Sequence, residues 1–190
     1  MALTGSSRVA ATTQNDLVFL WSATQSVAQN QSTVSWSLQL TAGPYGRISA
    51  TPGSGWAVSV DGQSFSGTTS IAIGNNETKV LASGSVVLPH DEAGERAFDY
   101  SFRQDFHITF GSSYIGTVSG SGDAVLDAIA RASQPTASAE TVTLGSSVEI
   151  FTNPQGDFTH ALEYSFGNAS GVIALCFCWV ICLQEPSSVR

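Results

Sequence analysis

Cysteine is missing from most of this 190-residue chain, and charged residues are scarce. No cysteine precedes Cys176, so no disulfide framework can hold the larger part of the protein together. Seven Lys and Arg stand against fifteen Asp and Glu, which gives a formal net charge of −8. Because no basic patch is available to neutralise phosphates, we expect neither nucleic acid nor a membrane as a partner.

The N-terminal segment lacks the features of a secretory leader. Residues 1–8 contain no charged region followed by an apolar one. If the chain begins at Met1 in nature, we expect it to be made and folded in a cytosol.

The motifs of common catalytic and cofactor sites are absent as well. There is no Gly-x-Ser-x-Gly elbow and no Gly-Lys-Ser/Thr phosphate loop, and Gly120-Ser121-Gly122 lacks the other glycines of a dinucleotide fingerprint. The spacing of Cys176, Cys178 and Cys182 matches no zinc or iron–sulfur cluster pattern. We therefore expect no enzyme, no cofactor and no metal centre.

The three histidines each have a structural interpretation. His90 precedes Asp91 and Glu92, which suggests either an acid–base or metal cluster or a turn introduced by the preceding proline. The turn explains the same residues without any chemistry. His107 lies on the polar face of a predicted strand, and we expect both it and His160 at the solvated surface.

Two pairs of carboxylates admit a glycosidase interpretation. Asp91 with Glu95, or Asp99 with Asp105, is the residue type that hydrolyses glycosides. The sequence does not place either pair across a cleft, and a glycosidase fragment is a further alternative.

The residues that are abundant are those of an all-β protein. Charged residues make up 12% of the chain, about half of the roughly 25% in an average soluble domain, and Ser, Thr and 18 Gly take their place. Strict alternation is clearest over residues 98–110, where Phe and Tyr occupy one face of a predicted strand. Gln104 interrupts that apolar face, and we expect a bulge, a bend or a passage between sheets there.

The segment 79–110 is the centre of the predicted fold. Its arms, 80–88 and 98–110, are predicted to form an antiparallel hairpin around the turn 89–95, in which Gly94 permits a positive φ.

Several further strands have similar lengths. Residues 1–16 suggest an edge strand or an arm, and Asp61-Gly62 favours a type I′ hairpin turn. The other predicted strands are 17–24, 33–40, 56–60, 65–73 and 114–126, with turns at 42–46 and 51–55. The pattern predicts an antiparallel β-sandwich of roughly seven to eight strands, Ig-like or jelly-roll-like, with a barrel as the alternative.

The pattern divides the chain into four parts. We predict a β-sandwich domain at 1–128, a linker at 129–139, the start of a second, truncated β-module at 140–174 and an anomalous tail at 175–190. Within the second module, strands are predicted at 141–144, 148–151 and 160–166. So few residues cannot close a sandwich of their own.

The tail is apolar, contains all three cysteines and shows no alternation. We hypothesise that it is a frameshifted or prematurely terminated reading of a longer gene. A membrane anchor is the competing interpretation, but the apolar run 171–183 is shorter than the roughly 20 residues that span a bilayer.

The order and spacing of four short segments resemble a known family. The segments are Trp21-Ser22-Ala23-Thr24-Gln25, Leu88-Pro89-His90-Asp91-Glu92-Ala93-Gly94, Leu126-Asp127-Ala128-Ile129-Ala130-Arg131-Ala132-Ser133 and Phe158-Thr159-His160-Ala161-Leu162-Glu163-Tyr164-Ser165-Phe166-Gly167. Over residues 1–174 the chain resembles the minor structural or tail proteins of siphoviruses and prophages of Gram-positive bacteria. That resemblance implies a virion component built from β-sandwich modules, assembled in the host cytoplasm, with other tail proteins and further copies of itself as partners.

Two aromatic residues are candidates for binding sugar rings. Tyr45 and Trp56 lie at or beside Gly- and Pro-rich turns, where an exposed ring offers a large contact area at a low entropy cost. For Trp56 the pattern favours the core face, which it would share with Val58 and Val60.

These observations lead to one expected function and one alternative. We expect a non-enzymatic component of a phage distal tail that presents loops to a cell-wall polysaccharide of the host. The alternative is a carbohydrate-binding or adhesin domain of a secreted bacterial surface protein.

Overall fold

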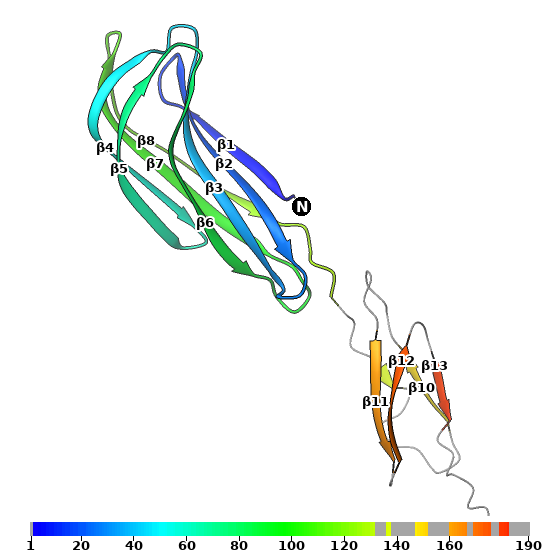
Figure 1. Cartoon of the computed structure of the whole chain (residues 1–190). Coiled ribbons are helices and arrows are strands. Elements are labelled where there is room, and N and C mark those ends of the chain that lie inside the picture. The colour runs from blue at the N-terminus through cyan, green and yellow to red at the C-terminus, as the bar shows by residue number, and fades with distance from the viewer. Residues whose placement is uncertain are drawn as a thin grey trace, which may run out of the picture. The chain divides into compact units, whose positions relative to one another are not determined.

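The structure is a computed structural model that describes residues 2–131, 136–137, 147–151, 160–166, 169–175 and 179–182. All of its regular elements are β-strands, and the strands of the larger part form two antiparallel sheets packed as a sandwich, so the predicted all-β sandwich is confirmed (Figure 1). The chain divides into two compact units, Met1–Ile129 and Ala130–Arg190, which we call the first and second unit and describe separately.

The first unit contains eight strands in two four-stranded sheets. One sheet has the order β1-β2-β3-β6 and the other the order β5-β4-β7-β8, which makes β1, β6, β5 and β8 the edge strands. The strands are β1 (Thr4–Ala10), β2 (Asn15–Ser26), β3 (Gln31–Ala42), β4 (Ile48–Val60), β5 (Gln63–Ile73), β6 (Thr78–Pro89), β7 (Ala97–Phe110) and β8 (Ser113–Val125).

The predicted pairing of the early strands is confirmed. β2 and β3 are antiparallel over their full lengths, with Trp21 opposite Trp36. β1 is an edge strand on β2, as the segment 1–16 suggested. Asp61 and Gly62 have φ values of 51° and 74°, so both central residues of the β4–β5 turn have the positive φ that a type I′ turn requires.

The predicted hairpin of 79–110 is wrong. β6 pairs with β3, whereas β7 pairs with β4 and β8, so residues 90–96 cross from one sheet to the other. Both arms have the expected alternation, but alternation fixes which face of a strand is buried and not which strand lies beside it. Stacked sheets are about 10 Å apart, a gap that this connection spans.

The predicted turn at 51–55 is also wrong, because β4 continues through it. The register with β5 shifts between Ile48 and Thr51 and again between Thr51 and Ser54, and Gly53 has a φ of 68°. These irregularities accommodate the Pro-Gly segment within β4, as β-bulges do near sheet edges, so the strand does not end there.

Gln104 does not mark a break in its strand. It is fully buried, lies opposite Trp56 and Val118, and its Nε2 donates to the carbonyl oxygen of Gly55 at 2.9 Å. The bulge lies slightly further along, where the β7–β8 register shifts between Asp105 and Ile108.

The core between the sheets is rich in stacked aromatic rings. Phe19 of β2 lies 4.9 Å from Tyr100 and 5.4 Å from Phe102 of β7, measured between ring centroids. Trp36 contacts Trp56 edge-on, with centroids 6.3 Å apart. Aromatic contacts of this kind contribute about 0.5–1.5 kcal/mol beyond the area they bury.

Each of five inward-facing aromatic residues lies opposite a glycine on the neighbouring strand. A Cβ added to any of these glycines would lie within 3.0 Å of the opposite ring, so the aromatic side chain occupies the space over the glycine. The pairs are Gly5 with Trp21, Gly84 with Trp36, Gly67 with Trp56, Gly120 with Phe102 and Gly122 with Tyr100.

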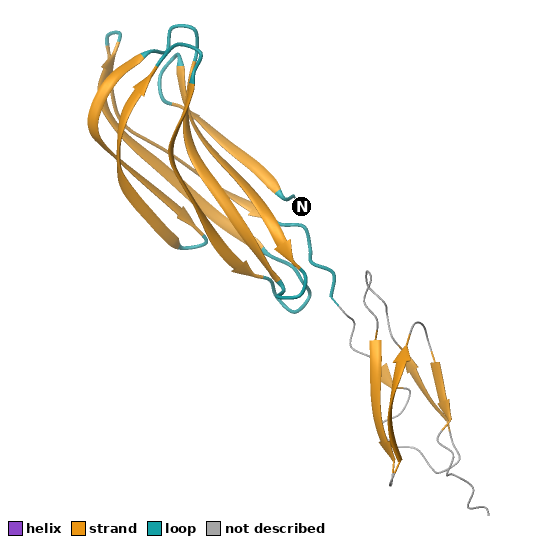
Figure 2. Cartoon of the chain, in the orientation of Figure 1, coloured by secondary structure: helices purple, strands orange, loops and turns teal. Residues whose placement is uncertain are grey.

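The loops of the first unit gather at its two ends (Figure 2). The connections 11–14, 43–47, 74–77 and 111–112 lie at one end, which we call the loop end, because successive strands of each sheet run in opposite directions. The connections 27–30, 61–62 and 90–96 lie at the other end, which we call the exit end, since β8 also finishes there. Ile129, predicted as linker, is 2% exposed and its N–H donates to Gly94 O, so it belongs to the first unit.

The second unit contains five short strands in its described part: β9 (Thr136–Ala137), β10 (Ser147–Phe151), β11 (His160–Phe166), β12 (Ala169–Leu175) and β13 (Trp179–Cys182). β10 pairs with β9 and β13, and β11 pairs with β12 as a hairpin. The predicted strands 148–151 and 160–166 are present, whereas 141–144 lies outside the described residues. Part of the apolar tail is therefore strand β13, although its sequence has no alternation.

Candidate binding site at the loop end

Hydrogen bonds join three loops at the loop end of the first unit. Gly43 N–H donates to Gln14 O at 2.7 Å, and Asn76 N–H donates to Gly43 O at 3.0 Å. Arg47 N–H donates to Asn75 Oδ1 at 2.9 Å. The connections 11–14, 43–47 and 74–77 therefore form one structure that the sheets hold in place, which we call the loop platform.

Asn15 and Gly46 explain why the chain folds this way locally. Asn15 is 1% exposed, and its Nδ2 donates to Gly46 O at 2.7 Å. Its Oδ1 accepts from the Thr12 hydroxyl at 2.7 Å, so both polar atoms of the buried amide are used. A Cβ at Gly46 would lie 2.6 Å from Gln14 O, so only glycine allows the loops this close approach.

Tyr45 projects from this platform. Gly46 N–H donates to Gly43 O at 3.1 Å, which closes a β-turn with Pro44 and Tyr45 as central residues. Pro44 supplies the φ that the first central position needs. The turn leaves Tyr45 78% exposed, as the sequence predicted for a residue in this segment.

A hollow of about 580 Å³ lies at the loop end, between the start of β4 and the end of β5, and its lining begins at Arg47, two residues after Tyr45. Arg47, Asn75 and Glu77 supply its polar groups, and Ile48 and Ile73 lie at its base. Glu77 Oε2 accepts from Gly74 N–H at 2.7 Å, which fixes the carboxylate at the rim. The hollow thus offers hydrogen-bond donors and acceptors on the same loop platform that carries the exposed Tyr45.

Trp56 does not join Tyr45 in this site. It lies in the middle of β4, on the same face as Val58 and Val60, and packs edge-on against the buried Trp36. The core-face interpretation of the pattern therefore describes its position, and the first half of β4 separates it from Tyr45.

A second exposed tyrosine at the loop end was missed by the sequence analysis. Tyr114 is 65% exposed next to the β7–β8 turn, and its hydroxyl lies 2.9 Å from His107 Nδ1. His107 is at the surface as predicted, but it has a φ of 49° within the β7–β8 bulge, a conformation that sequence alone does not reveal. His160 lies in β11 of the second unit.

His90 is buried at the exit end, where it joins the crossover to β3. Its Nδ1 lies 2.8 Å from Gly94 O, and because a carbonyl only accepts, this nitrogen carries the hydrogen. Its Nε2 lies 2.7 Å from the hydroxyl of Ser32, which is fully buried. Both ring nitrogens are therefore engaged within the fold, as the structural interpretation requires.

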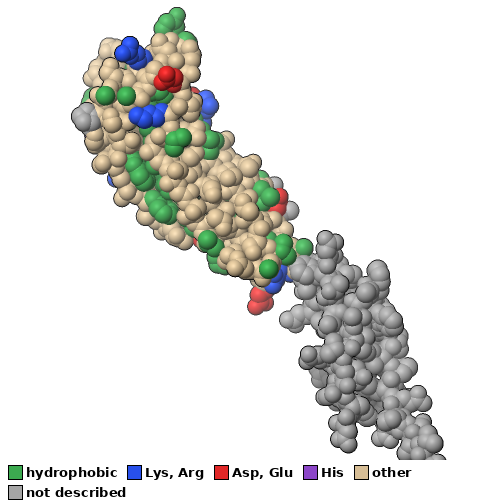
Figure 3. Space-filling model, in the orientation of Figure 1, with side chains coloured by type: hydrophobic (Ala, Val, Ile, Leu, Met, Phe, Trp, Pro, Cys, Tyr) green, Lys and Arg blue, Asp and Glu red, His purple; other side chains and the backbone are tan. Residues whose placement is uncertain are grey.

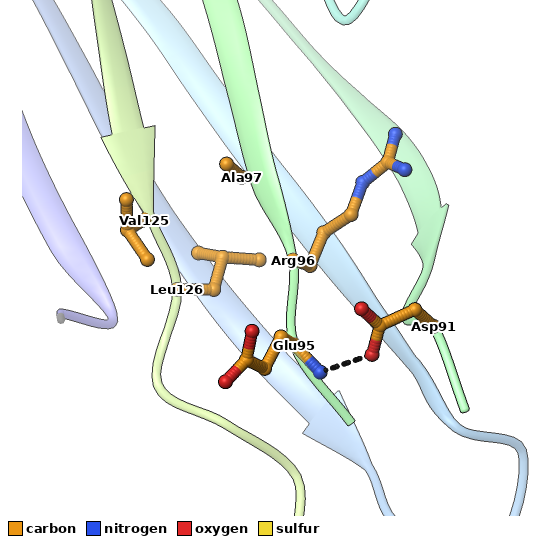
Figure 4. A pocket seen from close by; sticks show the side chains of 6 residues that line it. All are labelled: Asp91, Glu95, Arg96, Ala97, Val125 and Leu126. Carbon is orange, nitrogen blue, oxygen red and sulfur yellow. Dashed lines mark hydrogen bonds between the residues drawn. The ribbon is translucent and has the colours of Figure 1, made fainter. Parts of the chain in front are cut away.

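The carboxylate pairs lie far apart or have structural partners. Asp99 and Asp105 are six residues apart on the single strand β7, a separation of about 20 Å at 3.4 Å per residue. Retaining and inverting glycosidases need carboxyl groups about 5–9.5 Å apart. Asp91 Oδ1 accepts from Glu95 N–H at 2.7 Å within the crossover loop, at the edge of a hollow of about 400 Å³ (Figure 4).

The described part of the chain contains no group of three or more His, Cys, Asp and Glu residues arranged to hold a metal. Cys176 and Cys178 lie outside that part. No helix with the length and apolar character needed to cross a bilayer occurs among the described residues.

Comparison with known proteins gives one family match. A model described as "Siphovirus protein of unknown function (DUF859)" matches residues 18–177, which include most of both units. No curated protein and no solved structure matches the chain.

Proposed function

This chain belongs to the siphovirus family DUF859, and on that premise we propose that it is a non-enzymatic structural component of the distal tail that binds a host cell-wall polysaccharide. Family membership implies a component of the virion. The family also favours this function over the adhesin domain of a secreted bacterial protein. The finer assignment, to the tail and to glycan binding, is our proposal.

The observation that carries the proposal is the loop platform with its exposed Tyr45. A sugar ring has apolar C–H faces that stack on an aromatic side chain, and hydroxyl groups that both donate and accept hydrogen bonds. Arg47 can donate to such hydroxyls, Glu77 can accept from them, and both line the hollow on the same platform. The platform is held by hydrogen bonds before any ligand binds, which reduces the entropy cost of binding.

The position of the platform also supports this function. The strand that leads out of the first unit ends at the exit end, and the platform lies at the opposite end of the sheets. A rigid sandwich can thus be anchored through one end while it presents the other to a surface.

Binding of the labelled full-length chain to isolated walls from a panel of Gram-positive bacteria tests the proposal. We expect saturable binding to the walls of some strains, competed by their released polysaccharide and weakened by Tyr45→Ala. Val87→Ala is the matched control, because Val87 is also an exposed apolar residue (49%) but lies near the exit end of β6. A well-folded chain that binds no walls, or that binds equally well without Tyr45, would contradict glycan binding at this site.

The non-enzymatic part of the proposal has its own test. Incubation of the chain with walls that it binds is expected to release no reducing sugar ends. Release that disappears after Asp99→Asn or Glu95→Gln would instead identify a glycosidase.

A further inference from the structure

We propose that copies of this chain associate side by side by extending one of their sheets, with β8 of one copy pairing antiparallel to β5 of the next. The inference rests on the proposed structural role in the virion and does not depend on glycan binding. It identifies the two surfaces that meet and the orientation of the copies.

Both strands have an unpaired side. In the described part of the chain, β5 pairs only with β4, and β8 pairs only with β7 apart from the contact of Ala2 with Val125 and Leu126. Lys79 Nζ donates to Ser70 O, which fastens β5 near the loop end and leaves residues 63–69 without such a contact. An edge strand with free N–H and C=O groups is a template on which another strand can pair.

The chemistry of the edges distinguishes one sheet from the other. β5 contains no charged residue and no proline, and Asp123 is the only charged residue of β8. In the other sheet, β1 contains Arg8, and β6 contains Lys79 and Pro89. Charged residues and proline are among the means by which proteins prevent edge pairing. β5 has neither, and residues 113–122 of β8 have neither, since Asp123 lies two residues before the end of that strand. The neutral character of the surface is visible in Figure 3, where few acidic or basic side chains interrupt the first unit.

Strand direction determines how the copies are oriented. β5 runs from the exit end to the loop end, whereas β8 runs from the loop end to the exit end. Copies that stand side by side with the same orientation therefore bring β8 and β5 together as antiparallel strands. Every loop platform then faces the same way, whereas antiparallel pairing of β5 with a second β5 would turn one copy upside down.

The outer face of the sheet is compatible with pairing between β8 of one copy and β5 of the next, a boundary that we call the seam. Its registers place Ser64, Ser59, Ser101 and Ser121 in one row across β5, β4, β7 and β8. At a β8–β5 seam this hydroxyl row continues into the next copy. Pairs of Thr and Ser on adjacent strands form favourable cross-strand contacts, and no like charges are brought together.

The proposed contact is heterologous, because different surfaces of each copy meet. Such a contact closes into a ring if the rotation between copies allows it and otherwise continues as an open chain. Either arrangement would present several loop platforms on one side.

The arrangement can be tested by measuring the mass of full-length variants that carry charge substitutions on β5 and β8. The variant Ser64→Lys/Ser66→Lys places two cations on the exposed outer face of β5. Adding Ser119→Lys/Ser121→Lys on β8 puts like charges across every seam, whereas adding Ser119→Glu/Ser121→Glu puts opposite charges there. Light scattering after size exclusion then gives the mass of each variant, and the thermal transition shows that each is folded.

We expect the wild-type chain to have a mass of at least twice 19.8 kDa, the mass of one chain. The all-Lys variant should have the mass of a monomer, and the Lys/Glu variant should regain the wild-type mass. The control Ser6→Lys/Ser35→Lys, with two cations on the other sheet, should keep that mass. A wild-type monomer over the whole concentration range, or a folded all-Lys variant that still associates, would overturn the inference. Because the readout is mass, this test and the wall-binding test can fail independently.

Discussion

Asn15 Nδ2 donates a hydrogen bond of 2.7 Å to the carbonyl oxygen of Gly46, and this contact joins the first two loops of the platform. Asn15 is the first residue of β2, whereas Gly46 belongs to the connection between β3 and β4. The contact gives the exposed Tyr45, next to Gly46, a fixed base on the sheet. The rigidity of the proposed site therefore depends on a buried residue that does not line the hollow.

The variant Asn15→Ala is expected to lower the free energy of unfolding by about 1–3 kcal/mol, because it leaves Gly46 O without this donor in a buried position. Urea unfolding of the full-length chain measures the change. Thr13→Ala, an exposed position in the same loop, should change the value by less than about 0.5 kcal/mol. Equal stability of Asn15→Ala and wild type would mean that the loops are not held as described.

The pairing of glycines with aromatic rings predicts a second loss of stability. In Gly84→Ala the new Cβ would lie 2.6 Å from Cζ2 of Trp36, which is buried and cannot move aside. Overpacking of this kind costs about 1–3 kcal/mol, measurable as a lower midpoint of urea unfolding. The matched control is Gly116→Ala, where the nearest atom, Tyr114 Cε1, is 3.7 Å away. A Gly84→Ala variant as stable as this control would contradict the close contact with Trp36.

The crossover from β6 to β7 can be tested at His90. In His90→Ala, the buried Ser32 hydroxyl loses its partner at 2.7 Å and Gly94 O loses one of its two donors. We expect a loss of about 1–3 kcal/mol in stability from these unsatisfied groups. Adding Ser32→Ala should recover part of the loss, since it removes the orphaned hydroxyl. Glu92→Ala, an exposed change in the same loop, should have little effect.

The first unit is expected to fold without the second. Its buried core residues extend to Ile129, where the first unit ends, so a fragment of residues 1–131 should unfold in a single cooperative transition. Circular dichroism and tryptophan fluorescence should give the same midpoint. Two separate midpoints, or a broad transition without a folded baseline, would show that the fragment does not form a complete domain.

Alternation in the sequence predicted the strands well and their partners less well. The inward faces of β3 and β7 are buried as the pattern indicates, because a half-buried strand needs its apolar residues at every second position. That pattern does not determine which strand lies beside each of them. A hairpin and a crossover between sheets need the same alternation in both arms, so the sequence predicts a hairpin turn at 89–95 where the chain crosses between the sheets.

The sequence predicted some parts of the candidate site and not others, and each outcome has a physical reason. The Gly-Pro-Tyr-Gly turn signal predicted the exposed Tyr45, since a turn of this kind lies at the surface. The contact between Asn15 and Gly46 joins residues far apart in the chain, and no local pattern reveals it. The hollow with Arg47 and Glu77 likewise lies where the pairing register of β4 and β5 shifts near the loop end, and no local pattern predicts that shift.

The central claim is that the loop end of the first unit binds wall polysaccharide. The most direct test is a titration of the isotope-labelled full-length chain with polysaccharide released from walls that it binds, followed by the NMR shifts of its backbone amides. We predict saturable shifts at residues 43–47 and 74–77, reduced in Tyr45→Ala, with none at 27–30, 61–62 and 90–96. Shifts confined to the exit end, or none at any concentration, would contradict the account.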